Sequence, residues 1–177
     1  MIRDIVKYGS RVLRQVAEPV ARVDQDTQSL IKDLFDTLGE ADGVGLAAPQ
    51  IGVSLRVIVV DVTAQDRQTP PLAFVNPVIK IGHGMATAEE GCLSIPDLYG
   101  EISRYDSVEV TAVDQNGESF EIKSDGFYAR ILQHEIDHLD GRLFIDHLAP
   151  LKRQLLRGAL KRIKKEGEVW DERHLPA

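Results

Sequence analysis

The sequence predicts an α+β fold in which antiparallel strands pack around a central helix, with one further helix near each end of the chain. Strand-like segments dominate the first two thirds of the chain, and the last third holds two helix-like segments. The length of 177 residues fits a single domain, which we expect to span residues 1–177.

The N-terminal helix and the first strands follow from hydrophobic spacing. A helix is predicted at 25–41, and the segment 43–54 is expected to be irregular because it is rich in glycine and proline. Segments 55–62 and 71–79 are apolar and β-branched, so they are predicted as strands, the second irregular around Pro77.

A hairpin is predicted from two alternating segments, 107–114 and 119–125. Asn116 and Gly117 lie between them and favour a type I′ turn, whose two central residues both need positive φ. The preceding segment LYGEISRYD, 98–106, is expected to form a loop.

Two helices are predicted in the last third of the chain. The central one begins after Gly126 and ends at Gly141, and an amphipathic one covers about 149–166. In the latter we expect an apolar face with the residues Leu151, Leu155, Leu156 and Ile163.

Composition and charge exclude several classes of protein. The formal net charge of −7 argues against general nucleic-acid binding, DNA included, and no apolar run reaches the roughly 18 residues that span a membrane. The single cysteine, Cys92, excludes an intramolecular disulfide and favours a reducing compartment. The N-terminus resembles no signal or transit peptide, so we expect a cytoplasmic protein.

The central helix carries the pattern HExxH in His134, Glu135 and His138. Residues four apart lie on one face of a helix, so the two histidines can bind one divalent ion. Glu135 can then reach a water on the metal and act as a base.

A catalytic metal usually has three protein ligands. Metzincin proteases would place a histidine where this chain has Phe144, and Glu166 and Glu168 lie in or beyond a basic helix that suits no buried ligand. Cys92, within EEGCLSIPDLYG at 89–100, is the remaining candidate. These residue types alone leave both zinc and iron open.

Three segments together resemble the motifs of the peptide deformylases, most closely the bacterial type I group. They are GVGLAAPQIG at 43–52, EGCLSIP at 90–96 and QHEIDHLDG at 133–141. The resemblance covers about residues 5–150, which we expect to form the catalytic core. It implies a hydrolase that removes the N-formyl group from the initiator methionine of nascent polypeptides and releases formate.

The resemblance also implies roles for individual residues. It places the metal ligands at Cys92, His134 and His138, and the general acid/base at Glu135. It makes the Gln50 amide and the Leu93 backbone N–H oxyanion donors. It implies Fe²⁺ as the usual metal, replaceable by Ni²⁺, Co²⁺ or Zn²⁺.

The methionine side chain of the substrate needs an apolar pocket. We expect Val44, Phe127 and Ile131 to line it, because Phe127 and Ile131 each precede a histidine by about two helical turns. Gly45 and Gly91 complete the expected substrate site. Arg130 lies close in sequence to this pocket. Of two roles, contact with the backbone of a bound peptide or an ion pair with an acid at the surface, we expect the second.

The basic segment 151–165 contains seven Lys/Arg and no acid. Such a segment suits a phosphate-rich surface, and the deformylases that this chain resembles dock on the ribosome near the exit tunnel through a C-terminal helix. Two rival functions remain: another metallo-amidase or peptidase, which needs a different third ligand, and a non-catalytic ribosome-associated binding protein.

Overall fold

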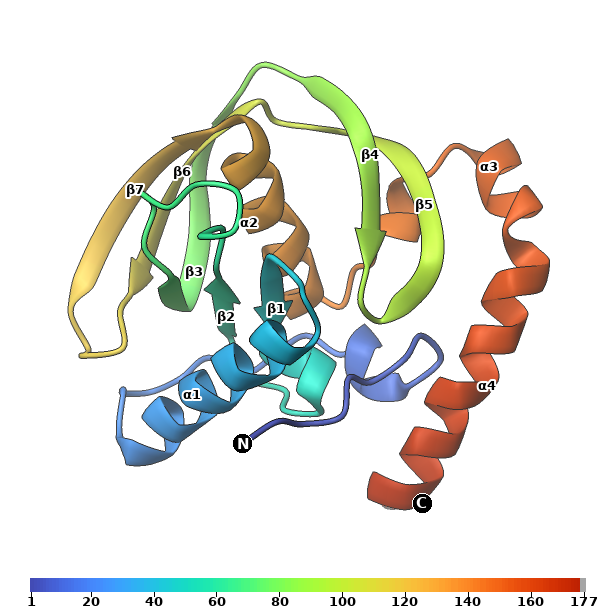
Figure 1. The fold of residues 1–177 in the computed structure, drawn as a ribbon, viewed down its shortest axis with the longest axis horizontal. Coiled ribbons are helices and arrows are strands. Elements are labelled where there is room, and N and C mark those ends of the chain that lie inside the picture. The colour runs from blue at the N-terminus through green and yellow to red at the C-terminus, as the bar shows by residue number, and fades with distance from the viewer. Residues whose placement is uncertain (176–177) are drawn as a thin grey trace.

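The computed structural model describes residues 1–175; the last two residues of the predicted domain, 176–177, lie outside this range. A helix, α2 (Gly126–Leu139), lies between a five-stranded antiparallel sheet and a separate two-stranded hairpin (Figure 1). The α+β prediction, with antiparallel strands around the HExxH helix, is therefore confirmed.

The larger sheet has the strand order β1-β2-β3-β6-β7. Its middle strands are apolar throughout or on alternate residues, because one face packs on α2 and the other on α1. Its strands are β1 (Gly45–Ala47), β2 (Val57–Val60), β3 (Leu72–His83), β6 (Ser107–Val113) and β7 (Ser119–Asp125). The separate hairpin consists of β4 (Ala86–Cys92) and β5 (Ile95–Arg104).

Helices cover the sheet and the hairpin. α1 (Gln25–Glu40) begins where the Asp24 carboxylate accepts a hydrogen bond from the Thr27 N–H at 3.0 Å, which is a typical N-cap. The other helices are α3 (Pro150–Leu155), α4 (Arg157–His174) and the short 3₁₀ segments η1 (Arg11–Arg14), η2 (Ala48–Ile51) and η3 (Phe144–His147).

Two segments expected to be irregular are regular in the structure. The Gly/Pro-rich stretch 43–54 contains β1 and η2, and the expected loop 98–106 is mostly β5. Both predictions were wrong because these elements depend on long-range pairing. β1 has no strand pattern but pairs with β2, and the polar strand β4 supplies the partner for β5.

The predicted hairpin of β6 and β7 is confirmed, but its turn is not type I′. Only Gly117 has positive φ, at 87°, while Asn116 does not. The Gly117 N–H donates to the Asp114 carbonyl at 3.1 Å, and the Asp114 N–H donates to the Glu118 carbonyl at 2.9 Å. This is a three-residue loop in which one glycine supplies the left-handed conformation.

The predicted C-terminal helix is broken at Leu156 and continues to His174. Ile163 is buried against the body of the protein as expected. Leu151 and Leu155, expected on the same apolar face, are 70% and 73% exposed because α3 turns away from the core.

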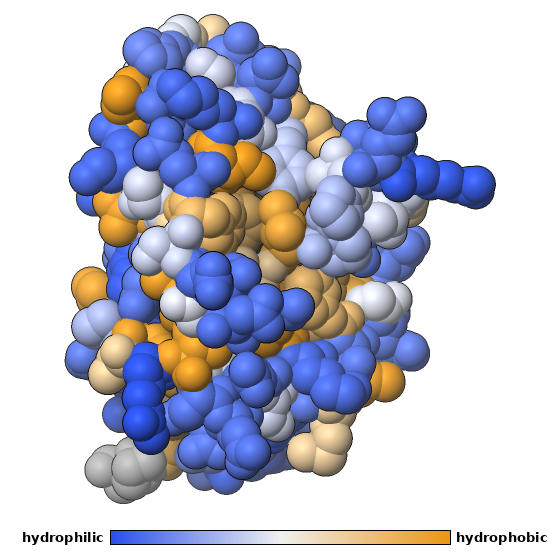
Figure 2. Space-filling view, turned by 90° about the vertical axis from the view of Figure 1, so that its left-hand side faces the viewer, coloured by the Kyte–Doolittle hydropathy of each residue, from blue (hydrophilic) through white to orange (hydrophobic). Residues whose placement is uncertain are grey.

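No helix within residues 1–175 is long and apolar enough to cross a membrane. On the face shown in Figure 2, hydrophilic residues dominate and hydrophobic ones gather near the middle.

Candidate active site

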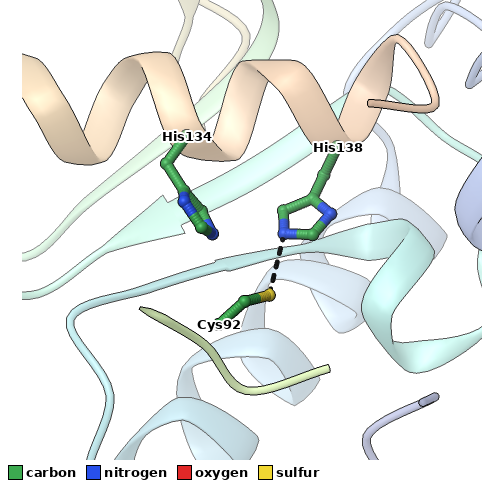
Figure 3. A group of neighbouring side chains, drawn as sticks. All are labelled: Cys92, His134 and His138. Atoms are coloured by element: carbon green, nitrogen blue, oxygen red, sulfur yellow. Dashed lines mark hydrogen bonds between the residues drawn. The ribbon is translucent and has the colours of Figure 1, made fainter. Parts of the chain in front are cut away.

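Cys92, His134 and His138 meet between α2 and the β4–β5 hairpin (Figure 3). Their ligand atoms all lie within 4.8 Å of one another, and Cys92 Sγ is 3.3 Å from His138 Nε2. Three ligand atoms around a tetrahedral divalent ion lie roughly 3.3–3.6 Å apart. The cluster therefore has the donor atoms and nearly the spacing that such an ion requires.

Helix α2 sets the direction of both histidines. Its opposite face carries Ala129, Leu132 and Leu139, which are fully buried in the core beside the sheet. Because His134 and His138 are one turn apart on the other face, they point together toward the hairpin (Figure 3).

The hairpin brings Cys92 to the histidines at an irregularity in its pairing. Gly91 pairs with Tyr99, but the register shifts between Gly91 and Cys92, and Cys92 pairs with Ile95. A Cβ on Gly91 would lie 2.7 Å from the Tyr99 ring. Glycine at this position therefore lets the strand lie against the ring just before the cysteine.

Glu90 orients the His134 ring through the nitrogen that faces away from the cluster. Its Oε1 lies 2.9 Å from His134 Nδ1, and a carboxylate can only accept, so the proton is on Nδ1 and the lone pair of Nε2 is free for a metal. Although burial alone would raise it, hydrogen bonds from His134 and Arg104 hold the pKa of Glu90 well below its usual range.

Two arginines complete this buried network. Arg104 binds both oxygens of Glu90, at 2.6 and 3.0 Å, and also Asp137 at 2.9 Å. Arg130 binds Glu90 at 2.7 Å and the carbonyl of Ala86 at 2.6 Å.

Sequence reasoning missed most of this network. Arg130 does pair with an acid, but the expectation that it would do so at the surface was wrong, because its side chain is buried. No role was assigned to Arg104. Glu90 lies within the motif EGCLSIP, two residues before Cys92, and this adjacency was the available signal.

The electrostatics of the site favour a cation. Burial, followed by the charges of His134 and Arg104, holds the pKa of His138 well below its usual range. His138 is therefore neutral, and its imidazole can act as a metal ligand. Burial opposes a charge on His134, but Cys92, Glu90 and Glu135 raise its pKa well above the usual range. The groups that favour a proton on His134 also favour a metal cation at the same lone pair.

Glu135 is buried beside the cluster, and its Oε2 has no hydrogen-bond partner among the described residues. Burial raises the pKa of this carboxyl to about 7, despite the opposing charge of His134. A general base with a pKa near neutrality can both accept and return a proton.

Gln50 presents its amide N–H₂ to the cluster. Its Oε1 accepts a hydrogen bond from the Ala47 N–H at 2.9 Å, so Nε2 points the other way, 3.2 Å from Ser94 Oγ and 3.5 Å from Cys92 Sγ. The side chain is buried at the end of η2, which fixes its direction.

Gly45 lies in β1, directly against α2. A Cβ at this position would be 2.6 Å from Glu135 Oε1 and 2.9 Å from Ile131 Cγ2. The glycine is therefore required for the close approach of β1 to the helix that carries Glu135.

A cavity of about 600 Å³ opens onto the cluster, which is within the usual range for small-ligand sites. It is lined by Cys92, His134, Glu135, Gln50 and Leu93, whereas His138 lies behind them and is fully buried. All five residues predicted for the substrate site also line it: Val44, Gly45, Gly91, Phe127 and Ile131.

Comparison with known proteins points to one family. The pattern of the family described as polypeptide deformylase matches residues 2–154. A peptide deformylase from Alkalilimnicola ehrlichii is 44% identical over 168 residues, which cover 95% of this chain and 94% of that protein.

Solved structures agree with the sequence match. A peptide deformylase from Legionella pneumophila is 47% identical with a TM-score of 0.86, covering 93% of this chain and 96% of that one. One from Synechococcus elongatus, solved in complex with actinonin, is 42% identical with a TM-score of 0.84, covering 90% and 86%. The chain belongs to the polypeptide deformylase family.

Proposed function

We propose that this deformylase hydrolyses the formyl group of N-formylmethionyl peptides at the cluster of Cys92, His134 and His138, with formate and a free N-terminal amine as products. The observation that carries the proposal is the buried Glu135, whose Oε2 has no hydrogen-bond partner among the described residues, beside three convergent metal-ligand side chains, two of which line one cavity with it. A metal site completed by cysteine is distinct from the histidine or glutamate sets of the peptidases considered above. Family membership supports neither a peptidase nor a non-catalytic binding protein.

Each residue has a defined task in this proposal. Glu135 accepts a proton from the attacking water and passes it to the leaving amine nitrogen. Gln50 Nε2 and the Leu93 N–H donate hydrogen bonds to the oxygen on which negative charge develops. Val44, Phe127 and Ile131 enclose the methionine side chain, while Gly45 and Gly91 leave room for the peptide backbone.

The metal in this proposal is one divalent ion, Fe²⁺, for which Ni²⁺, Co²⁺ or Zn²⁺ can substitute. When bound, it would polarise the formyl carbonyl and lower the pKa of a water ligand. Two neutral imidazoles and a thiolate suit several of these ions, and the resemblance to other deformylases favours iron.

The test is formate release from formyl-Met-Ala-Ser by protein purified without oxygen, with its metal content measured. Acetyl-Met-Ala-Ser is the matched control, because its extra methyl group tests the selectivity for formyl. We expect formate from the first peptide, no acetate from the second, and no internal cleavage of either. Internal cleavage, or no formate from fully metallated protein, would refute the proposal.

We further propose that the basic segment 151–165, which covers nearly all of α3 and the first half of α4, docks on the ribosome near the exit tunnel. Seven basic residues and the exposed Leu151 and Leu155 support this, because they combine charge for phosphates with an apolar contact. Deleting both helices is a poor test, since Leu160 and Ile163 are buried in the body of the protein.

Charge reversal is a cleaner test of docking. The triple variant Lys152→Glu, Arg157→Glu and Lys161→Glu changes exposed residues only. It should lose co-sedimentation with ribosomes at low salt while formate release is unchanged. The control triple Arg67→Glu, Lys80→Glu and Lys123→Glu changes the charge equally, and equal loss in both triples would contradict docking through these helices. We also propose a location in the bacterial cytoplasm, because the proposed substrates are nascent polypeptides.

A further inference from the structure

Residues 6–10, here called the N-terminal strap, bridge two segments of the active site. The Val6 N–H donates to the carbonyl of Gln50 at 2.8 Å, and the Tyr8 N–H donates to the carbonyl of Ser94 at 2.8 Å. Gln50 and Ser94 are 44 residues apart in sequence and already contact each other through their side chains, so the strap adds two backbone hydrogen bonds to the junction of these segments.

Lys7 lies between these two anchors, and its side chain reaches the active site. Its ammonium donates to the carbonyl oxygen of Leu93 at 3.0 Å, and the side chain lines the same cavity as Glu135. The carbonyls of Leu93 and Ser94 follow directly after Cys92. Tyr8 holds the Ser94 carbonyl, and Lys7 holds the Leu93 carbonyl. Lys7 therefore holds the peptide group that follows Leu93, adjacent to the peptide group that carries the Leu93 N–H.

We propose that Lys7 is a positioning residue for deformylation: it holds the Leu93 backbone so that the Leu93 N–H and the Gln50 amide converge on one oxygen. This inference rests on the proposed function and on the donor roles assigned there. An oxyanion hole works because its donors are fixed before charge develops, so a small rotation of one donor weakens catalysis without preventing binding.

Helix α4 holds the strap from the other side. A Cβ on Gly167 would lie 2.4 Å from the Lys7 carbonyl oxygen, and one on Gly9 would lie 2.1 Å from the Lys164 carbonyl oxygen, so the two backbones are in direct contact. Asp171 also accepts hydrogen bonds from Ser10 Oγ and from the Arg11 N–H. The strap is thus a fixed base from which the Lys7 side chain reaches Leu93.

A direct contact between Lys7 and the substrate is the competing explanation, and steady-state kinetics separate the two. A residue that binds substrate equally in the ground and transition states changes KM, whereas a residue that positions a transition-state donor changes kcat.

The experiment compares Lys7→Met, Lys7→Gln and Lys7→Arg in full-length, metal-loaded enzyme with formyl-Met-Ala-Ser as substrate. Lys7→Met keeps the apolar stem and removes the donor. We expect kcat to fall about tenfold with KM unchanged, and Lys7→Arg, which still donates, to restore most of the activity. Lys7→Gln is too short to reach Leu93, so we expect the same fall in kcat. It keeps the test decisive if Lys7→Met folds poorly.

Hydrogen exchange supplies a readout that does not depend on activity. Backbone amides in residues 92–95 should exchange faster in Lys7→Met than in the wild type and return to the wild-type rate in Lys7→Arg. Lys123→Met, which removes an exposed ion pair with Glu109, is the control and should change neither kcat nor this exchange.

Each other outcome overturns the inference. Wild-type kcat in Lys7→Met, a change in KM alone, or a loss that Lys7→Arg does not restore would each exclude positioning through the Leu93 carbonyl. Absence of formate release from the wild type would instead refute the proposed function itself, so the two failures are distinguishable.

Discussion

Helix α2 and the β4–β5 hairpin both supply side chains to the metal cluster, but they hold them by different means. In α2, the spacing of His134 and His138 follows from helix geometry within four residues. In the hairpin, Cys92 lies at a register shift, and its neighbour Glu90 is held by arginines from β5 and α2. The positions of the two histidines are therefore set by local helix geometry, whereas the position of the hairpin that carries Cys92 depends on long-range ionic contacts.

This difference has a consequence for the effects of mutation. Changes on the ligand face of α2 should alter the chemistry while the fold is kept, because the buried face of the helix is untouched. Changes in the buried part of the hairpin should alter both stability and metal binding. The following three variants test this contrast, from the largest expected effect to the smallest.

Glu135→Gln should lower kcat by about 10²–10⁴-fold, because the amide cannot accept the proton that the carboxylate accepts. Stability and metal content should stay close to wild type, since Gln has nearly the same shape. Formate release, thermal unfolding and metal analysis check these three points. Substantial activity in this variant would contradict the assignment of Glu135 as the acid/base.

Glu90→Gln should weaken metal affinity by about 10–100-fold, because His134 loses the acceptor that orients its ring. It should also lower the free energy of unfolding by about 3–5 kcal/mol, since Arg130 loses its buried counter-charge and Arg104 keeps only Asp137. Chelator competition and urea denaturation measure the two effects.

Glu101→Gln is the control for Glu90→Gln on the partner strand. Glu101 is exposed, so this change should alter the free energy of unfolding by no more than about 0.5 kcal/mol. If Glu90→Gln were as stable as this control, the hairpin would not depend on the ionic network.

Of the three test variants, Thr87→Ala should have the smallest effect, although Thr87 lies only three residues before Glu90. Thr87 Oγ1 and Ser103 Oγ form an exposed cross-strand hydrogen bond of 2.6 Å, and such pairs contribute about 0.2–1 kcal/mol. Urea denaturation of Thr87→Ala and of Glu90→Gln would compare the two kinds of contact in one strand. A loss for Thr87→Ala as large as that for Glu90→Gln would show that strand pairing, rather than buried charge, holds the hairpin.

Much of the fold follows from short-range pattern. The helix of residues 25–40, the buried strand β2 and the hairpin of β6 and β7 were predicted because spacing and β-branched composition are local properties. β4 was missed because its sequence ATAEEGC is short of strand-forming residues and its strand conformation comes from pairing with β5.

The candidate site shows the same division. Glu135 and its two neighbouring histidines are recognisable from HExxH, and Cys92 was proposed as the third ligand by elimination and by resemblance. The structure brings Cys92 to the two histidines, and Glu135 lines the same cavity as Cys92 and His134. The contact from Lys7 to Leu93 joins residues 86 positions apart, and no local pattern predicts it.

The sequence by itself determined that one helix carries two metal-ligand histidines and a carboxylate, because a period of 3.6 residues fixes which side chains share a face. Only the tertiary structure decided which charges meet in the interior, where Glu90, Arg104 and Arg130 converge from three elements. It also decided that the C-terminal helix breaks at Leu156 and holds the N-terminal strap. These features depend on the burial of groups distant in sequence, which hydrophobic periodicity does not encode.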